Sequence, residues 1–296
     1  MVTLVIGGAG YMGKHTAHTL RRRGHEVIIY DNFSTGHRAL ARGFELIVGE
    51  ASDSTKMVEV LRRVDAVLRV AACAYVGESV IDPRKFENNV RTALSLVDTV
   101  LNSHLRKFIF SSSCAVYGTP SSLAITERWP RAPVSPMARA IGEMHSPETH
   151  LIPCALQAIQ DNRDLQIFGN DYPGEDDTCV RDYIHVSDLA VPHVRGLEYL
   201  AGPSVELNPG TGMGQSVRQI LSAVEQQTGC PVPVEVSPRP AADPRVLVAD
   251  PSQAQRLLTW KAQRSLEQIV AIAWQWAPGS HHHAPHTSGA NQLVTA

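Results

Sequence analysis

The sequence has few cysteines, and none of them stands next to another. Cys73, Cys114, Cys154, Cys179 and Cys230 are scattered singly along 296 residues. This spacing matches no zinc-binding motif, and the odd number argues against a disulfide framework. We therefore expect buried thiols in a reducing cytoplasm, and no metal site.

A long apolar run and an excess of charge of one sign are also absent. The chain is 43% hydrophobic and 19% charged, with a formal net charge of −2. No segment approaches membrane-spanning length, and the N-terminus is typical of a strand rather than a signal peptide. The balanced charge gives no basic surface for nucleic acid. We expect neither a membrane nor a nucleic-acid partner.

A glycine loop follows the first apolar run. Val2–Ile6 is typical of a buried parallel strand, and a helix is expected over 14–23; between them stands Gly7-Gly8-Ala9-Gly10-Tyr11-Met12-Gly13. Gly7 permits the tight turn, Gly10 lets the backbone approach a pyrophosphate, and Gly13 lets helix and strand pack closely. The unpaired N–H groups at the start of the helix would hold the phosphates. The arrangement predicts a dinucleotide site.

The next strand strengthens that prediction. Its residues 26–30 end in Asp31, about twenty residues past the loop, where an acid hydrogen-bonds the adenosine ribose. A carboxylate there would repel the extra phosphate of NADP. Asp31 therefore favours NAD.

Strand and helix patterns then alternate. Strands are expected over 44–48, 65–71 and 107–112, with helices over 55–63 and 83–102 between them. On the longer helix one apolar stripe is formed by Val90, Leu94, Val97 and Leu101. This alternation predicts an α/β fold with a Rossmann-type, doubly wound parallel sheet and ligands at the carboxyl ends of its strands.

Motifs along the whole chain carry a family resemblance. Beside the glycine loop they include D-N-F-S-T-G-H-R at 31–38, S-S-S-C-A-V-Y-G at 111–118 and C-V-R-D-Y-I-H-V-S-D-L-A at 179–190. From Val2 to about Trp276 the chain resembles the extended short-chain dehydrogenases and, within them, the UDP-glucose 4-epimerases. The resemblance implies a cytoplasmic, NAD-dependent isomerase that interconverts UDP-glucose and UDP-galactose through a 4-keto intermediate.

The same resemblance implies a division of the chain. An NAD-binding domain would cover 1–148, rejoined by about 183–208. A smaller C-terminal domain over 149–278 would bind the UDP-sugar, and 279–296 would be a disordered tail.

Site residues are also carried over by resemblance. The cofactor would be held by Gly7, Gly10, Tyr11, Met12, Gly13, Asp31, Asn32, Ser34, Thr35, Gly36, Glu50, Ala51, Val70, Ala71, Ala72, Asn89 and Ser111. Ser113 resembles the catalytic serine that hydrogen-bonds the sugar 4-oxygen. The UDP-sugar would be held by His150, Leu151, Phe168, Arg181, Arg239 and Asp243. An arginine suits a diphosphate because its guanidinium is a planar, permanently charged fork.

The chain departs from the family at the reaction itself. The family places a Tyr-x-x-x-Lys pair on a helix, and this chain has Met137 and Ile141 at those two positions. Neither a thioether nor an alkyl group can move a proton. No tyrosine of the chain has a lysine four residues later. We therefore expect weak activity or none.

The departure extends beyond two residues. Compared with the family, a helix and a sixth strand, roughly thirty residues in all, are missing, and the expected deletion junction lies near 138–140. Three interpretations stay open: an active epimerase with an unrecognised base, an NAD- or nucleotide-binding module without catalysis, and a nonfunctional deleted copy. Family members are homodimers through the lost helix and the helix over 83–102. This chain is instead expected to be a weakly stable monomer or to aggregate.

Overall fold

A five-stranded parallel sheet forms the N-terminal half of the molecule. The computed structural model describes residues 1–71, 84–120, 124–133, 150–200, 202–239 and 243–277. Its first sheet has the order β3-β2-β1-β4-β5 and is parallel throughout. The strands are β1 (Val2–Ile6), β2 (Glu26–Asp31), β3 (Glu45–Val48), β4 (Ala66–Arg69) and β5 (Phe108–Phe110). The predicted Rossmann-type sheet is confirmed.

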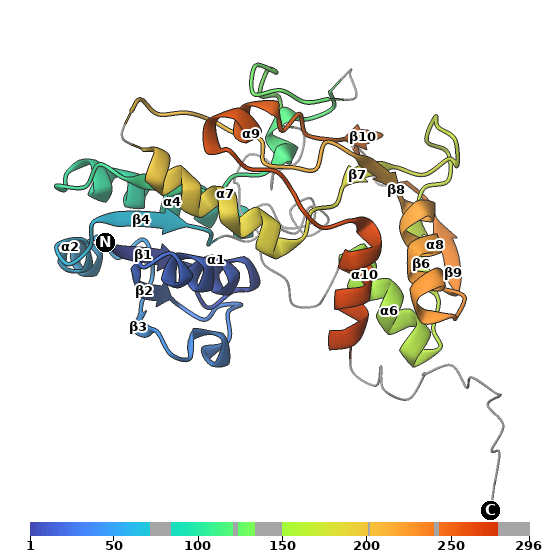
Figure 1. Ribbon diagram of the computed structural model, residues 1–296, viewed down its shortest axis with the longest axis horizontal. Coiled ribbons are helices and arrows are strands. Elements are labelled where there is room, and N and C mark those ends of the chain that lie inside the picture. Colours follow the sequence, from blue (N-terminus) through green and yellow to red (C-terminus); the bar gives the residue numbers. More distant parts are fainter. Residues whose placement is uncertain (72–83, 121–123, 134–149, 201, 240–242, 278–296) are drawn as a thin grey trace, which may run out of the picture.

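Helices cover both faces of this sheet, because successive side chains of a buried strand point to opposite sides. On one face α1 (Tyr11–Arg22) packs beside α7 (Val186–Tyr199), a helix far away in sequence. On the other face lie α2 (Ser54–Leu61) and α4 (Arg84–Leu101). Sheet and helices thus form three layers, and Figure 1 labels these four helices beside strands β1 to β4. The two faces carry separate apolar cores, as a doubly wound sheet requires.

The C-terminal half combines helices with two small sheets. Helices α6 (Leu151–Asp161), α8 (Val217–Thr228) and α10 (Leu266–Trp276) share one core with strand β6 (Leu165–Phe168). Strand β9 (Val234–Ser237) pairs in parallel with β6 and is largely exposed. These elements lie on the right of Figure 1. A second small sheet joins β10 (Val246–Leu247), β7 (Val180–Asp182) and β8 (Gly214–Ser216). Short helices complete the described part: η1 (Arg38–Ala41), η2 (Cys114–Tyr117) and α9 (Ser252–Leu258). The proposed domain bounds stay a prediction.

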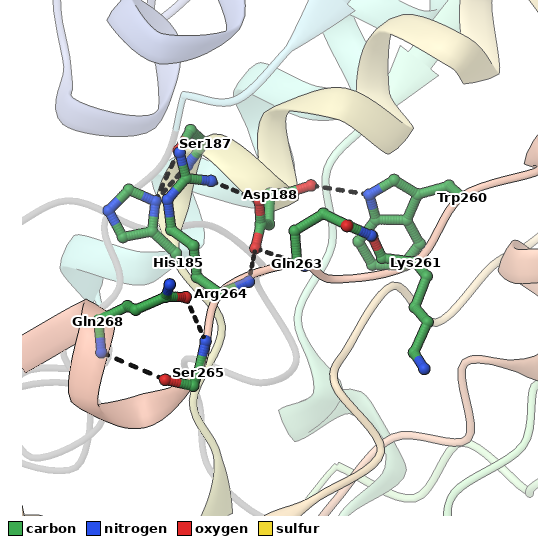
Figure 2. A network of polar contacts seen from close by, with 9 residues as sticks. All are labelled: His185, Ser187, Asp188, Trp260, Lys261, Gln263, Arg264, Ser265 and Gln268. Carbon is green, nitrogen blue, oxygen red and sulfur yellow. Dashed lines mark hydrogen bonds and ion pairs between the residues drawn. The ribbon is translucent and has the colours of Figure 1, made fainter.

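A buried carboxylate ties α7 to the segment that leads into α10. Asp188 is 4% exposed and accepts hydrogen bonds from the backbone N–H groups of Gln263 (2.9 Å) and Arg264 (2.8 Å). The Arg264 guanidinium donates to the same carboxylate at 2.6 Å, and the Trp260 indole donates to the Asp188 carbonyl at 3.1 Å. Figure 2 shows these donors converging on Asp188. The carboxylate therefore fixes where the chain returns toward α10.

The outer face of α4 and the outer edge of β5 are uncovered in the described part of the chain. Val90, Leu94 and Leu101 are 39%, 64% and 75% exposed, whereas Leu96 and Val100 face the sheet core. Within the described residues β5 pairs with β4 alone, so the sheet ends there. Most of the predicted apolar stripe therefore faces away from the sheet.

The cysteines correct one expectation. Cys114 is exposed, and Cys154, Cys179 and Cys230 are partly exposed, so none of the four described thiols is buried and none of them forms a disulfide. Cys114 is exposed because it opens the short helix η2 after β5, outside the apolar strand. Cys73 lies outside the described residues. Of the helices that the structure describes, none is both long and apolar enough to cross a membrane.

Candidate functional site

A pocket lies at the carboxyl ends of β1, β2, β3 and β4. Nine of the expected cofactor residues line it together: Gly7, Asp31, Asn32, Ser34, Thr35, Glu50, Ala51, Ala71 and Asn89. Ile6, Tyr30, Gly49, Arg69 and Thr92 complete the lining. The pocket has the position that a parallel α/β sheet reserves for a ligand.

The glycine loop closes one wall of this pocket. Gly7 has φ +83°, and a Cβ there would lie 2.7 Å from the Cα of Ala71. A Cβ on Gly13 would overlap the carbonyl oxygen of Gly7. Helix α1 begins after Gly10 with no side-chain cap, and Tyr11 and Met12 form its first turn. Backbone N–H groups at this helix start are the donors that a phosphate needs.

Asp31 is held rigidly at the end of β2. It is 6% exposed, and its carboxylate accepts hydrogen bonds from the N–H groups of Ala9 at 2.9 Å and Phe33 at 2.8 Å. A Cβ on Gly36 would lie 2.9 Å from Asp31 Oδ1, so this position needs glycine. Each carboxylate oxygen keeps a free lone pair for a ribose hydroxyl.

Asn32 and Glu50 meet across the mouth of the pocket. The Asn32 amide donates to both carboxylate oxygens of Glu50, at 3.0 and 3.1 Å. The Tyr30 hydroxyl donates to the Glu50 carbonyl at 2.9 Å. These bonds join the ends of β2 and β3, where the resemblance expects adenine.

The remaining expected residues are placed differently. Val70 is buried in the apolar core rather than in the pocket lining. Ser111 follows β5 and its N–H donates to the Arg69 carbonyl at 3.0 Å, while Ser113 begins η2 and accepts from the Ala115 N–H at 3.3 Å. Ala72, Met137 and Ile141 lie outside the described residues.

A second polar cluster lies in the C-terminal half. The Arg181 guanidinium donates to Asp243 Oδ1 at 2.9 Å, and the Tyr172 hydroxyl donates to Asp243 Oδ2 at 2.6 Å. Burial and the adjacent Asp243 carboxylate raise the pKa of Tyr172, which keeps its hydroxyl protonated. Arg239 stacks over the Tyr172 ring at 4.8 Å. Three of the six expected substrate residues thus come together.

The other three expected substrate residues lie on neighbouring elements. Phe168 ends β6 and is 51% exposed, next to Gly169, whose φ of +88° brings the chain against Tyr172 and Arg239. His150 precedes α6 and is exposed, and Leu151 opens that helix and packs on its core.

Sequence reasoning missed Tyr172 in the cluster and Arg69 in the pocket. The sequence contains a feature that could have identified Arg69, because it is the one charged residue in the apolar run 66–70. Tyr172 had none beyond its place in a motif, since its partner Asp243 stands 71 residues later.

The site combines the glycine loop, the Asp31 carboxylate and the parallel sheet. These three features together define an NAD-binding protein of the Rossmann type. Residues 3–141 match the model of the NAD dependent epimerase/dehydratase family. UDP-glucose 4-epimerase from Rhizobium leguminosarum bv. trifolii is 39% identical, over 95% of this chain and 98% of that protein. The chain therefore belongs to the UDP-glucose 4-epimerase family and is NAD-dependent by family.

Solved structures agree with this assignment. UDP-glucose 4-epimerase from Brucella ovis in complex with NAD has a TM-score of 0.85 and 38% identity, covering 91% of this chain and 96% of that one. The enzyme from Stenotrophomonas maltophila, with bound NAD and formylated UDP-arabinopyranose, has a TM-score of 0.88 and 31% identity. Coverage there is 96% of this chain and 100% of that one.

The relatives are longer than this chain. The alignment with the Rhizobium leguminosarum protein spans 321 positions, 25 more than the 296 residues here, so at least that many positions have no counterpart. The family match also ends at Ile141, beside the junction expected from the sequence. The relative therefore contains positions that this chain lacks.

Proposed function

We propose that this chain is an NAD-binding member of the UDP-glucose 4-epimerase family whose interconversion of UDP-glucose and UDP-galactose is strongly impaired. The observation that carries the proposal is the contrast between a formed pocket around Asp31 and a sequence without the proton-transfer pair. When bound, NAD supplies a hydride acceptor that later returns the hydride. The chain must still move the proton of the sugar hydroxyl.

Proton transfer is the weak part of this site. Met137 and Ile141 occupy the positions of the family's tyrosine and lysine. Ser113 keeps a hydroxyl near the end of β5 and can hold the sugar oxygen, but a serine hydroxyl is a poor base at neutral pH. Tyr117 is the tyrosine nearest to Ser113 in the sequence. Its hydroxyl donates to the Asn208 side-chain oxygen at 2.9 Å, and burial raises the pKa of Tyr117. Both features support a structural role for Tyr117.

The UDP-sugar site is proposed at the Arg181 cluster. Asp243 and Tyr172 hold Arg181 in one orientation, and Arg239 adds a second guanidinium beside the Tyr172 ring. Two positioned guanidinium groups suit the two phosphates of a nucleoside diphosphate. Phe168 offers an exposed ring nearby for the uracil.

A non-catalytic NAD-binding module is the second candidate. The formed pocket and the intact glycine loop favour it over a copy without function. In both candidate functions the protein is cytoplasmic and its cofactor is NAD. The two candidates differ in turnover alone.

Turnover of UDP-galactose tests the proposal. Protein purified from a host without its own epimerase should convert UDP-galactose about 10²–10⁴-fold more slowly than an intact relative, the usual range for lost acid–base catalysis. Calorimetry with the same protein should show tighter binding of NAD than of NADP. Turnover within tenfold of the relative would contradict the impairment. Binding of NAD with no detectable turnover would favour the module.

Assembly follows from the uncovered face of α4. We propose that the chain forms no stable family-type dimer, because Leu94 and Leu101 are exposed and β5 is an edge in the described sheet. Exposed apolar patches and open strand edges promote nonspecific association. Light scattering after size-exclusion chromatography should show a monomer or heterogeneous aggregates. A monodisperse dimer with a cooperative melt at high temperature would contradict this, and Leu94→Glu should reduce any aggregation.

A further inference from the structure

Arg69 is a buried cation with unmet hydrogen-bonding capacity. It ends β4, which lies between β1 and β5 in the sheet, and is 1% exposed. Its Nε and Nη1 atoms have no hydrogen-bond partner among the residues that the structure describes. A buried N–H group without an acceptor is costly, and a charged one more so. Such a group in a folded protein calls for an explanation.

The described neighbours of Arg69 do not satisfy these donors. The Phe110 ring on β5 lies 4.9 Å from the guanidinium carbon, which is a favourable contact but occupies no N–H group in a hydrogen bond. Burial lowers the pKa of Arg69 to about 10, so the group is still charged at neutral pH. The full positive charge therefore remains to be balanced.

Arg69 also lines the cofactor pocket. It is the one cationic side chain among the described lining residues, and two of the others, Asp31 and Glu50, are carboxylates. A dinucleotide brings a negatively charged pyrophosphate into a pocket with this acidic lining. The glycine loop offers backbone N–H groups to the phosphates but no full positive charge.

We propose that Arg69 is a cofactor-binding residue whose guanidinium binds an anionic phosphate of NAD from the floor of the pocket. The inference rests on the NAD-binding part of the proposed function and is independent of turnover. A charge-assisted hydrogen bond in a water-poor site is stronger than a neutral one, and it removes the unmet donors at the same time.

Binding measurements with three ligands test the assignment. NAD and ADP-ribose contain the pyrophosphate, and adenosine does not. Arg69→Met, which keeps an apolar stem, should weaken NAD and ADP-ribose roughly 10- to 100-fold by calorimetry, the equivalent of one lost charge-assisted bond. Adenosine affinity, measured by NMR titration, should stay within about twofold. The thermal melt without ligand confirms that the variant is folded.

Two further variants control the experiment. Arg63→Met also removes one positive charge, but from an exposed pair with Glu45, and should leave all three affinities unchanged. Arg69→Lys keeps the charge and loses the fork, so its NAD affinity should lie between those of the wild type and Arg69→Met. If Arg69→Met does not fold, Arg69→Lys alone decides the question.

The outcomes separate this inference from the proposed function. Unchanged NAD affinity in the Arg69 variants would overturn the role of Arg69 and leave NAD binding intact. An equal loss for adenosine would place Arg69 at the nucleoside instead and overturn the phosphate assignment. A wild-type protein that binds no NAD would overturn both.

Discussion

Asp188 and Arg69 are both buried charges, and they differ in how many partners surround them. The Asp188 carboxylate accepts three hydrogen bonds, one of them from the Arg264 guanidinium. Arg69 has two N–H-bearing nitrogen atoms without a described acceptor. A buried charge with all its hydrogen-bond partners in the protein stabilises the fold. A buried charge with unused donors at a pocket can form its hydrogen bonds with a ligand that binds there.

Substitution of Asp188 should give the largest effect in this comparison. Asp188→Asn keeps the size of the side chain but places an amide N–H toward backbone donors and leaves Arg264 without its counter-charge. We expect the free energy of unfolding to fall by about 2–4 kcal/mol, since Arg264 is partly exposed and screened by solvent. Urea unfolding monitored by circular dichroism measures it.

Asp161→Asn is the matched control for that experiment. Asp161 pairs with Arg163 at 3.4 Å, and both side chains are more than half exposed. Its loss should change the free energy of unfolding by less than about 0.5 kcal/mol. Equal effects of the two substitutions would show that burial does not decide the role of Asp188.

The imidazoles near the Asp188 network should give a smaller, pH-dependent effect. Burial, with the nearby His185 and Lys14 adding to it, lowers the pKa of His15 to about 4 from 6.5. The unfolded chain then binds more protons than the folded chain between these values. The stability of the fold that is linked to the neutral His15 side chain is therefore complete above pH 6.5 and is lost as the pH falls toward 4. Because His15 is partly exposed, we expect a contribution of about 1–2 kcal/mol.

His15→Gln isolates this contribution, because it removes the titration and keeps a polar side chain. The slope of unfolding free energy against pH between 6.5 and 4 should be shallower in the variant than in the wild type. Identical slopes would mean that other groups, such as the buried His193, carry the acid sensitivity; burial lowers its pKa as well.

Removal of Arg69 should give the smallest change in stability, and in the opposite direction. Without NAD, Arg69→Met removes an unpaired buried charge and loses the Phe110 contact. We expect the free energy of unfolding to rise by about 1 kcal/mol or less. Urea unfolding without ligand is the measurement. A fall of more than about 1 kcal/mol would show that Arg69 is a structural group like Asp188.

The sequence by itself determined the N-terminal sheet and the cofactor. The strands around Val2–Ile6 and Glu26–Asp31 are local patterns of apolar residues, and the glycine loop is a local backbone requirement. Neighbouring residues encode both, so no distant contact is needed to read them. The placement of Asp31 at the pocket follows, because parallel strands end at the same edge.

Tertiary structure alone decided what the charged and exposed groups face. Arg181 and Asp243 stand 62 residues apart, and Asp188 and Arg264 stand 76 apart, so their pairing is invisible in either segment. The burial of Arg69 beside Phe110 and the exposure of Leu94 on α4 depend in the same way on the order of strands and helices. The local sequence determines whether an element is a helix or a strand. The packing of elements against one another determines which side chains are covered and which stay exposed.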